Sequence, residues 1–89
     1  MSVTFFGMVW AQTRTVNGVV KDATGEPIIG ASVVVTGTTT GTITDMKGNF
    51  RLDVPASART LEVSYVGMQK QVVPITTGTI NVILQDETK

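Results

Sequence analysis

The 89-residue sequence predicts an all-β domain, and three observations carry that prediction. Thr and Val make up about a third of the chain, whereas Ala and Leu, which favour helices, are scarce. Apolar and polar residues alternate in several short stretches, as they do in half-buried strands. Turn-forming residues interrupt these stretches at intervals of about ten residues, a spacing typical of a β-sandwich rather than of βαβ units.

The first expected strand is Thr15–Lys21. It should close in a turn where the Asp22 carboxylate bonds the backbone that follows and Gly25 supplies a positive φ. The next expected strand is Ser32–Thr36, whose consecutive valines indicate either cover on both faces or a partly shielded outer face. The small residues Gly30 and Ala31 just before it indicate a close approach of two backbones.

The stretch Gly37–Thr44 is β-prone through its threonines but weakly hydrophobic, which suits an edge strand or a loop with a short strand near Thr42. A tight turn at Asp45–Gly48 should follow. The segment Asn49–Val54 then alternates cleanly and predicts a half-buried strand with Phe50 directed into the core.

Three further segments complete the expected strand set. Thr60–Val66 alternates, with Tyr65 among its inward side chains, and Gly67 ends it. Met68–Ile75 is the next expected strand and Thr79–Leu84 is the last, whereas the polar tail after it is expected to fray.

These segments add up to about seven strands and no helix. Two packed antiparallel sheets of three or four strands are the simplest way to bury one face of each strand. The sequence therefore predicts a seven-stranded Greek-key β-sandwich forming a single domain, without internal repeats. A core of this size is marginal without disulfides or metal, so support from neighbouring protein is plausible.

Residues 1–11 are set apart as the remnant of a signal peptide, and residues 12–89 as the domain. Ser2–Ala11 is an uncharged apolar run, with Val9 and Ala11 at the −3 and −1 spacing that signal peptidases accept. It lacks the usual basic start, and a first β-strand is the alternative reading. The run is too short to span a bilayer as a helix, so no direct membrane insertion is expected.

The composition excludes several kinds of function. The chain contains no His and no Cys, which removes the usual zinc ligands, the Ser–His and Cys–His nucleophile pairs and any disulfide. Seven basic residues balance seven acidic ones, so no nucleic-acid partner is expected. The segment Asp45–Asn49 has too few oxygen ligands for a calcium loop and reads better as a type I turn with an Asx bond. We therefore expect no enzyme, no cofactor and no catalytic, cofactor-binding or metal-binding residue.

Protein partners are the remaining class. The edge segment Thr36–Thr44 could expose backbone groups for strand addition, including self-association, and the alternative is a solvated edge protected by its turns. Phe50 and Tyr65 both read as core anchors rather than as a stacking platform. A carbohydrate-binding or adhesive sandwich would need an exposed aromatic cluster, which these positions do not offer.

Beyond its pattern, the sequence resembles a known family over about Thr15–Gln85. The resemblance lies in VNGVVKDATGEPIIGASVVVTGTTTGTITDMKGNFRLDVP, followed by LEVSYVGMQKQVVPI. These segments resemble the carboxypeptidase-regulatory-like, transthyretin-like domain. They are similar in particular to its version at the mature N-terminus of SusC/RagA-type TonB-linked outer-membrane transporters of the Bacteroidetes.

The resemblance implies a prealbumin-like sandwich of seven strands without catalysis. It also implies a place at the periplasmic face of the outer membrane, ahead of a TonB box, a plug and a barrel that imports nutrients. On this reading the domain is an accessory module whose partners are the plug and barrel or periplasmic energising proteins. A free-standing secreted or surface-displayed carbohydrate-binding or adhesive β-sandwich is the alternative.

Overall fold

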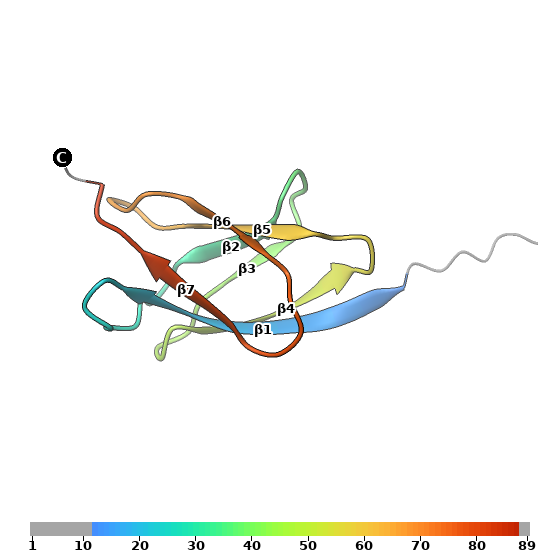
Figure 1. The fold of residues 1–89 in the computed structure, drawn as a ribbon, viewed down its shortest axis with the longest axis horizontal. Helices are drawn as coiled ribbons and strands as arrows, with labels where there is room; N and C mark the ends of the chain where they lie inside the picture. The colour runs from blue at the N-terminus through green and yellow to red at the C-terminus, as the bar shows by residue number, and fades with distance from the viewer. Residues whose placement is uncertain (1–11, 88–89) are drawn as a thin grey trace, which may run out of the picture.

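The computed structural model describes residues 12–87, and over that range the chain forms seven strands and no helix (Figure 1). The strands are β1 (Thr13–Asp22), β2 (Ser32–Val35), β3 (Gly41–Ile43), β4 (Asn49–Pro55), β5 (Thr60–Ser64), β6 (Gln71–Pro74) and β7 (Ile80–Leu84). They form a three-stranded sheet in the order β4-β1-β7 and a four-stranded sheet in the order β3-β2-β5-β6. The predicted all-β, seven-stranded sandwich is confirmed, and the expected leader at residues 1–11 lies outside the described residues.

Most connections pass from one sheet to the other. Only the β2–β3 and β5–β6 connections join neighbours within a sheet, so the strands alternate between the two layers in Greek-key fashion. The prediction that both sheets are antiparallel is wrong at one place, because β7 runs parallel to β1, with Gly18 opposite Ile80. The β6–β7 connection crosses from one sheet to the other near the end of the sandwich where β1 begins. β7 therefore starts at that end and runs in the same direction as β1.

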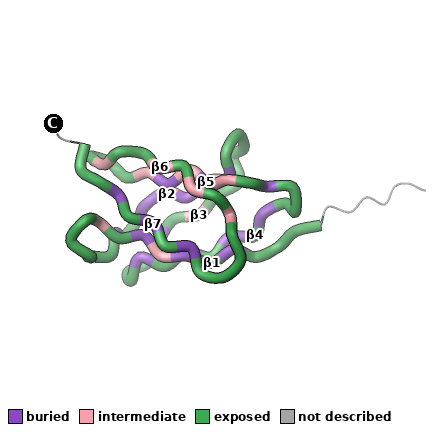
Figure 2. The backbone as a smooth tube through the Cα atoms, in the orientation of Figure 1, coloured by how far each residue is buried: buried purple, intermediate pink, exposed green. Residues whose placement is uncertain are grey.

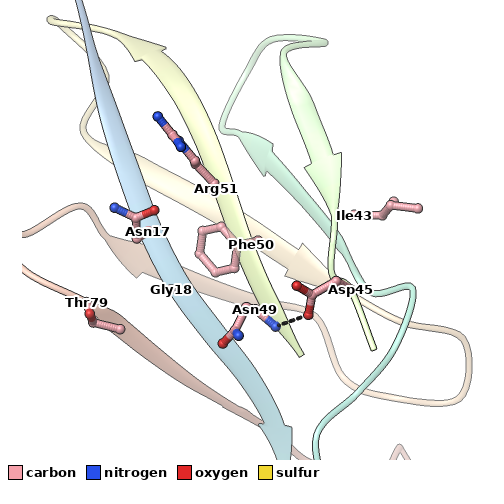
Figure 3. Close-up of a pocket in the computed structure, with 8 residues that line it drawn as sticks. All are labelled: Asn17, Gly18, Ile43, Asp45, Asn49, Phe50, Arg51 and Thr79. Atoms are coloured by element: carbon pink, nitrogen blue, oxygen red, sulfur yellow. Dashed lines mark hydrogen bonds between the residues drawn. The ribbon is translucent and has the colours of Figure 1, made fainter. Parts of the chain in front are cut away.

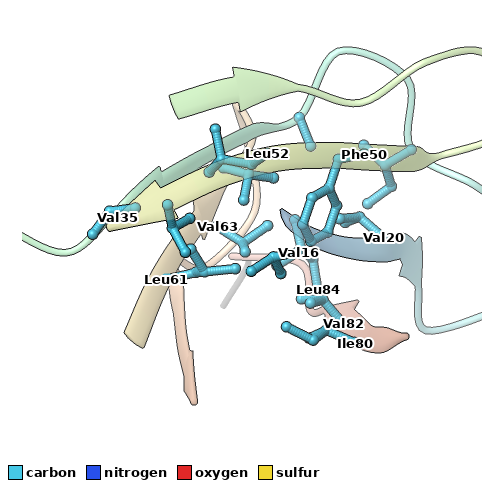
Figure 4. Close-up of a cluster of buried hydrophobic side chains, with 14 of the residues drawn as sticks. Val16, Val20, Val35, Phe50, Leu52, Leu61, Val63, Ile80, Val82 and Leu84 are labelled. Carbon is cyan, nitrogen blue, oxygen red and sulfur yellow. The ribbon is translucent and has the colours of Figure 1, made fainter. Parts of the chain in front are cut away.

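The core lies between the sheets and comes from the alternating positions of both. Val20, Val33 and Leu61 are completely buried, and Figure 4 shows side chains from both sheets meeting in the middle. Figure 2 shows the same alternation of buried and exposed positions along the strands. The predicted inward position of Phe50 is confirmed, and Val34 is half-buried on a partly shielded outer face. Each fully buried aliphatic side chain of this core stabilises the fold by about 1.5–3 kcal/mol relative to the same side chain left exposed.

The predicted strand Thr60–Val66 is too long at its end. A turn begins at Tyr65, whose carbonyl accepts a hydrogen bond of 3.0 Å from Met68 N–H, and Gly67 has a φ of 79°. Tyr65 is therefore 37% exposed and Val66 is 86% exposed, so the prediction that Tyr65 points inward is wrong. The next strand is also shorter than predicted, because Met68 makes only an isolated bridge, with Asp86.

The glycines serve two different purposes. Gly25 has the predicted positive φ, at 92°. Gly30 also has a positive φ, of 81°. The close backbone approach predicted at Gly30 and Ala31 is present, because Gly30 N–H donates to the Thr44 carbonyl at 3.1 Å and Thr44 N–H donates to the Ala31 carbonyl at 3.0 Å. A Cβ at Gly30 would find open space, whereas a Cβ at Gly18 would meet the Phe50 ring and would lie 2.6 Å from the Ile80 carbonyl oxygen.

Candidate protein-interaction surface

Three connections and the C-terminal segment gather at one end of the sandwich, on the left in Figure 1. The strand register places them together, because Asp22 lies opposite Leu84, and Ser32 lies opposite both Ile43 and Ser64. We call this end the loop end and define it as residues 22–31, 43–48, 65–70 and 85–87. The other three connections, residues 36–40, 56–59 and 75–79, lie at the opposite end, near the start of β1.

The loop end carries most of the exposed large apolar side chains. Among the described residues there are seven, and five of them lie here: Ile29, Ile43, Met46, Tyr65 and Val66, with exposed fractions of 56%, 65%, 76%, 37% and 86%. Single exposed apolar residues are normal on a protein surface. Five at one end of a small domain make that end a candidate surface for contact with another protein.

Thr44 fixes the first two of these connections against each other. Its buried hydroxyl donates a hydrogen bond of 2.6 Å to the Ile28 carbonyl and accepts one of 2.8 Å from Ala31 N–H. Gly30 N–H also donates to the Thr44 carbonyl, at 3.1 Å. Ile29, which lies between these bonded residues, is therefore held out on a rigid connection.

Two aspartates close the turns of the loop end. The Asp22 carboxylate accepts hydrogen bonds from the backbone N–H groups of Thr24 and Glu26 and from the Thr24 hydroxyl, and these bonds lower its pKa, the hydroxyl bond most of all. Asp45 accepts from Lys47 N–H and Asn49 N–H in the same way. The expected Asx bonds are confirmed, and both carboxylates are already engaged by their own turns.

The C-terminal segment is tied to the loop end. The Gln85 carbonyl accepts a hydrogen bond of 2.8 Å from Gln69 N–H, and Glu87 N–H donates one of 3.0 Å to the Gly67 carbonyl. The expectation that the tail frays directly after β7 is therefore wrong for residues 85–87. This pairing could not be predicted from the sequence, because the segment is polar and short.

The loop end is acidic as well as apolar. It contains five carboxylates and two lysines, a formal charge of −3, although the whole chain is neutral. The carboxylates are Asp22, Glu26, Asp45, Asp86 and Glu87. One of the two lysines, Lys70, also forms an ion pair of 3.7 Å with Glu62 on β5. The connections at the opposite end hold a single charged residue, Arg59.

A groove of about 430 Å³ lies beside β4 (Figure 3). It is lined by Asn17, Gly18, Ile43, Asp45, Asn49, Phe50, Arg51 and Thr79. Its carboxylate, Asp45, faces its own turn, as the dashed bond to Asn49 in Figure 3 shows. Its cation, Arg51, lies on the outer face of β4. Asp45 and Arg51 are the two charged residues among those that line the groove.

The predicted edge segment is confirmed as an edge. β3 pairs only with β2 and forms one border of the four-stranded sheet. Among residues 12–87, no three His, Cys, Asp or Glu side chains lie together as a metal would require. Over the same range no helix is long and apolar enough to cross a membrane.

Comparisons with known proteins agree with this picture. TonB-dependent receptor SusC of Bacteroides thetaiotaomicron is 54% identical over 80 residues, which is 90% of this chain and 8% of that receptor. TonB-dependent receptor P3 of Formosa agariphila is 35% identical over 79 residues, covering 86% of this chain and 8% of that receptor. The chain thus spans less than a tenth of the length of these curated relatives.

Solved structures share the fold, and one of them serves as an example. It is a chain in a crystal structure of a type II Cohesin-X-Dockerin complex from Acetivibrio cellulolyticus, with a TM-score of 0.57 and 24% identity, covering 80% of this chain and 51% of that one. The likeness supports the sandwich architecture alone. The profile of the CarboxypepD_reg-like domain matches residues 16–89, and the chain belongs to that family.

Proposed function

We propose that this chain is a non-catalytic accessory domain of a SusC/RagA-type TonB-dependent receptor, at the periplasmic face of the outer membrane. It precedes the plug and barrel and acts through protein contacts. The observation that carries the proposal is the 54% identity to TonB-dependent receptor SusC over 90% of this chain. A second curated TonB-dependent receptor, at 35% identity, supports it.

The chemistry of the chain supports a contact function. Without His or Cys, proton transfer near neutral pH would need a carboxyl or amine with a strongly shifted pKa. The shift that the structure does produce lowers the pKa of Asp22, which keeps that carboxylate ionised. The apolar, acidic loop end is instead a feature that another protein can recognise.

The alternative of a carbohydrate-binding or adhesive sandwich finds less support. Such surfaces use several exposed aromatic rings on which sugars stack. Among the described aromatic residues, Phe50 is 4% exposed and Tyr65 is 37% exposed. One half-exposed ring does not make a stacking surface.

Deleting the domain in frame from the intact receptor tests the proposal. Residues 12–87 are removed, and both the amount of receptor in the outer membrane and the uptake of its nutrient are measured. We expect uptake to fall at least tenfold. If the domain docks energising or partner proteins, uptake falls while the receptor stays in the membrane. If the domain supports folding, uptake and the amount of receptor fall together. Unchanged uptake and unchanged receptor would contradict the proposal.

A further inference from the structure

We infer that the loop end is the docking surface for the part of the receptor that follows this domain in the same polypeptide. The contact is apolar at its centre and is bordered on the receptor side by Lys and Arg. This inference rests on the proposed function, because it takes the domain to precede the plug and barrel. It specifies the surface of this domain that is used, the part of the receptor that this surface contacts, and the chemistry of that part.

The apolar side chains form one neighbouring group rather than scattered points. The hydrogen bond from Gly30 N–H to the Thr44 carbonyl joins the connections that carry Ile29 and Met46. The register that places Ser32 opposite Ser64 brings the segments that carry Ile29 and Tyr65 side by side. The two remaining exposed apolar residues lie on strands outside the loop end, Val72 on β6 and Ile83 on β7. The loop end is thus the apolar pole of the described domain.

The polypeptide leaves the domain at this pole. The bond from Glu87 N–H to the Gly67 carbonyl holds the last described residue beside Val66, the most exposed apolar side chain. A protein surface that follows directly along the chain is confined close to the loop end, at an effective concentration on the order of millimolar. At that concentration even a small apolar contact would be largely occupied.

The negative charge of the loop end favours a basic partner surface over a second copy of the chain. A second copy docking end to end would place two surfaces of formal charge −3 against each other, which like-charge repulsion disfavours. A surface bordered by Lys or Arg would gain from the same five carboxylates. The lowered pKa of Asp22 keeps its carboxylate charged at neutral pH.

Side-chain oxidation of the intact receptor by hydroxyl radicals, read by mass spectrometry, tests the inference. Met46 and Tyr65 report on the loop end, and the double variant Ile29→Asp/Val66→Asp disrupts its apolar centre. We expect the oxidation of Met46 and Tyr65 to be at least fivefold faster in this variant than in the unchanged receptor. The matched control Ile83→Asp adds a carboxylate on β7, opposite Lys21 of β1. It should leave both oxidation rates unchanged.

Three results would overturn the inference. One is equal oxidation of Met46 in the unchanged receptor and the double variant, which would mean that nothing covers the loop end. Another is faster oxidation in the Ile83→Asp control as well, which would mean that the double variant acts on the fold rather than on a contact. The third is protection that grows with receptor concentration, which would identify a second copy as the occupant. Failure of the proposed function is separate, because it would appear as normal uptake after deletion of the domain.

Discussion

At the residue scale, Thr44 is the buried polar group that holds the loop end together. Replacing it by Val keeps the shape but leaves the Ile28 carbonyl and the Ala31 N–H without their partner. We expect Thr44→Val to lower the free energy of unfolding by about 1–3 kcal/mol. Thr44→Ser keeps the hydroxyl and should cost about 1 kcal/mol or less. Urea unfolding measures both variants, and a Thr44→Val chain as stable as the parent would contradict this role.

Gly18 shows a different constraint at the same scale. A Cβ there would meet the Phe50 ring and would lie 2.6 Å from the Ile80 carbonyl oxygen. We therefore expect Gly18→Ala to destabilise the domain by about 1–3 kcal/mol through overpacking. In a Phe50→Leu background the added methyl group has more room, so the same substitution should cost less. Equal costs in the two backgrounds, compared in a double-mutant cycle by urea unfolding, would refute the proposed clash.

Asp22 links stability to pH. Its folded-state pKa lies below the usual 3.8, because the Thr24 hydroxyl and the backbone of Glu26 and Thr24 bond its ionised form. The stabilisation is therefore complete above about pH 4 and is lost as the pH falls through the lowered pKa. We expect Asp22→Asn to be less stable than the parent chain at pH 7 and equally stable at pH 2. Thermal unfolding across this range measures the difference, and a gap that persists at pH 2 would contradict the assignment.

At the element scale, the strands were predictable because burial on one face imposes a period of two. Asn49–Pro55 and Ile80–Leu84 alternate between buried and exposed positions over their whole length. The strand ends were not predictable in the same way. Tyr65 continues the alternation of β5, yet the turn closed by Met68 N–H and Gly67 takes it out of the sheet. The direction of β7 also could not be predicted from its sequence, because parallel and antiparallel strands share the same two-residue alternation of side chains.

Self-association through β3 belongs to this scale and stays a prediction. The strand borders the four-stranded sheet but has only three residues, so it offers few free backbone groups to a partner strand. Light scattering of the chain at increasing concentration tests it. Growth of a dimer would support edge pairing. A monomer at the highest concentration would leave the alternative, an edge protected by its turns.

At the scale of the whole molecule, the domain has two unlike ends, and the sequence did not reveal this. The sequence predicts a turn at Met46 but assigns no exposure to Ile29 or Val66. Their exposure depends on where each strand stops, which tertiary hydrogen bonds decide. One signal was present: Ile29 and Val66 directly precede glycines with positive φ, and turn positions of this kind lie at the surface.

The central claim is that these residues form the accessory domain of a TonB-dependent receptor. Sequencing the gene through and beyond the codon for Lys89 tests it most directly. We expect an open reading frame that continues into a short TonB-box-like segment, a plug and many amphipathic strands. A stop codon directly after Lys89 would contradict it and would identify a free-standing domain whose partner must be sought elsewhere.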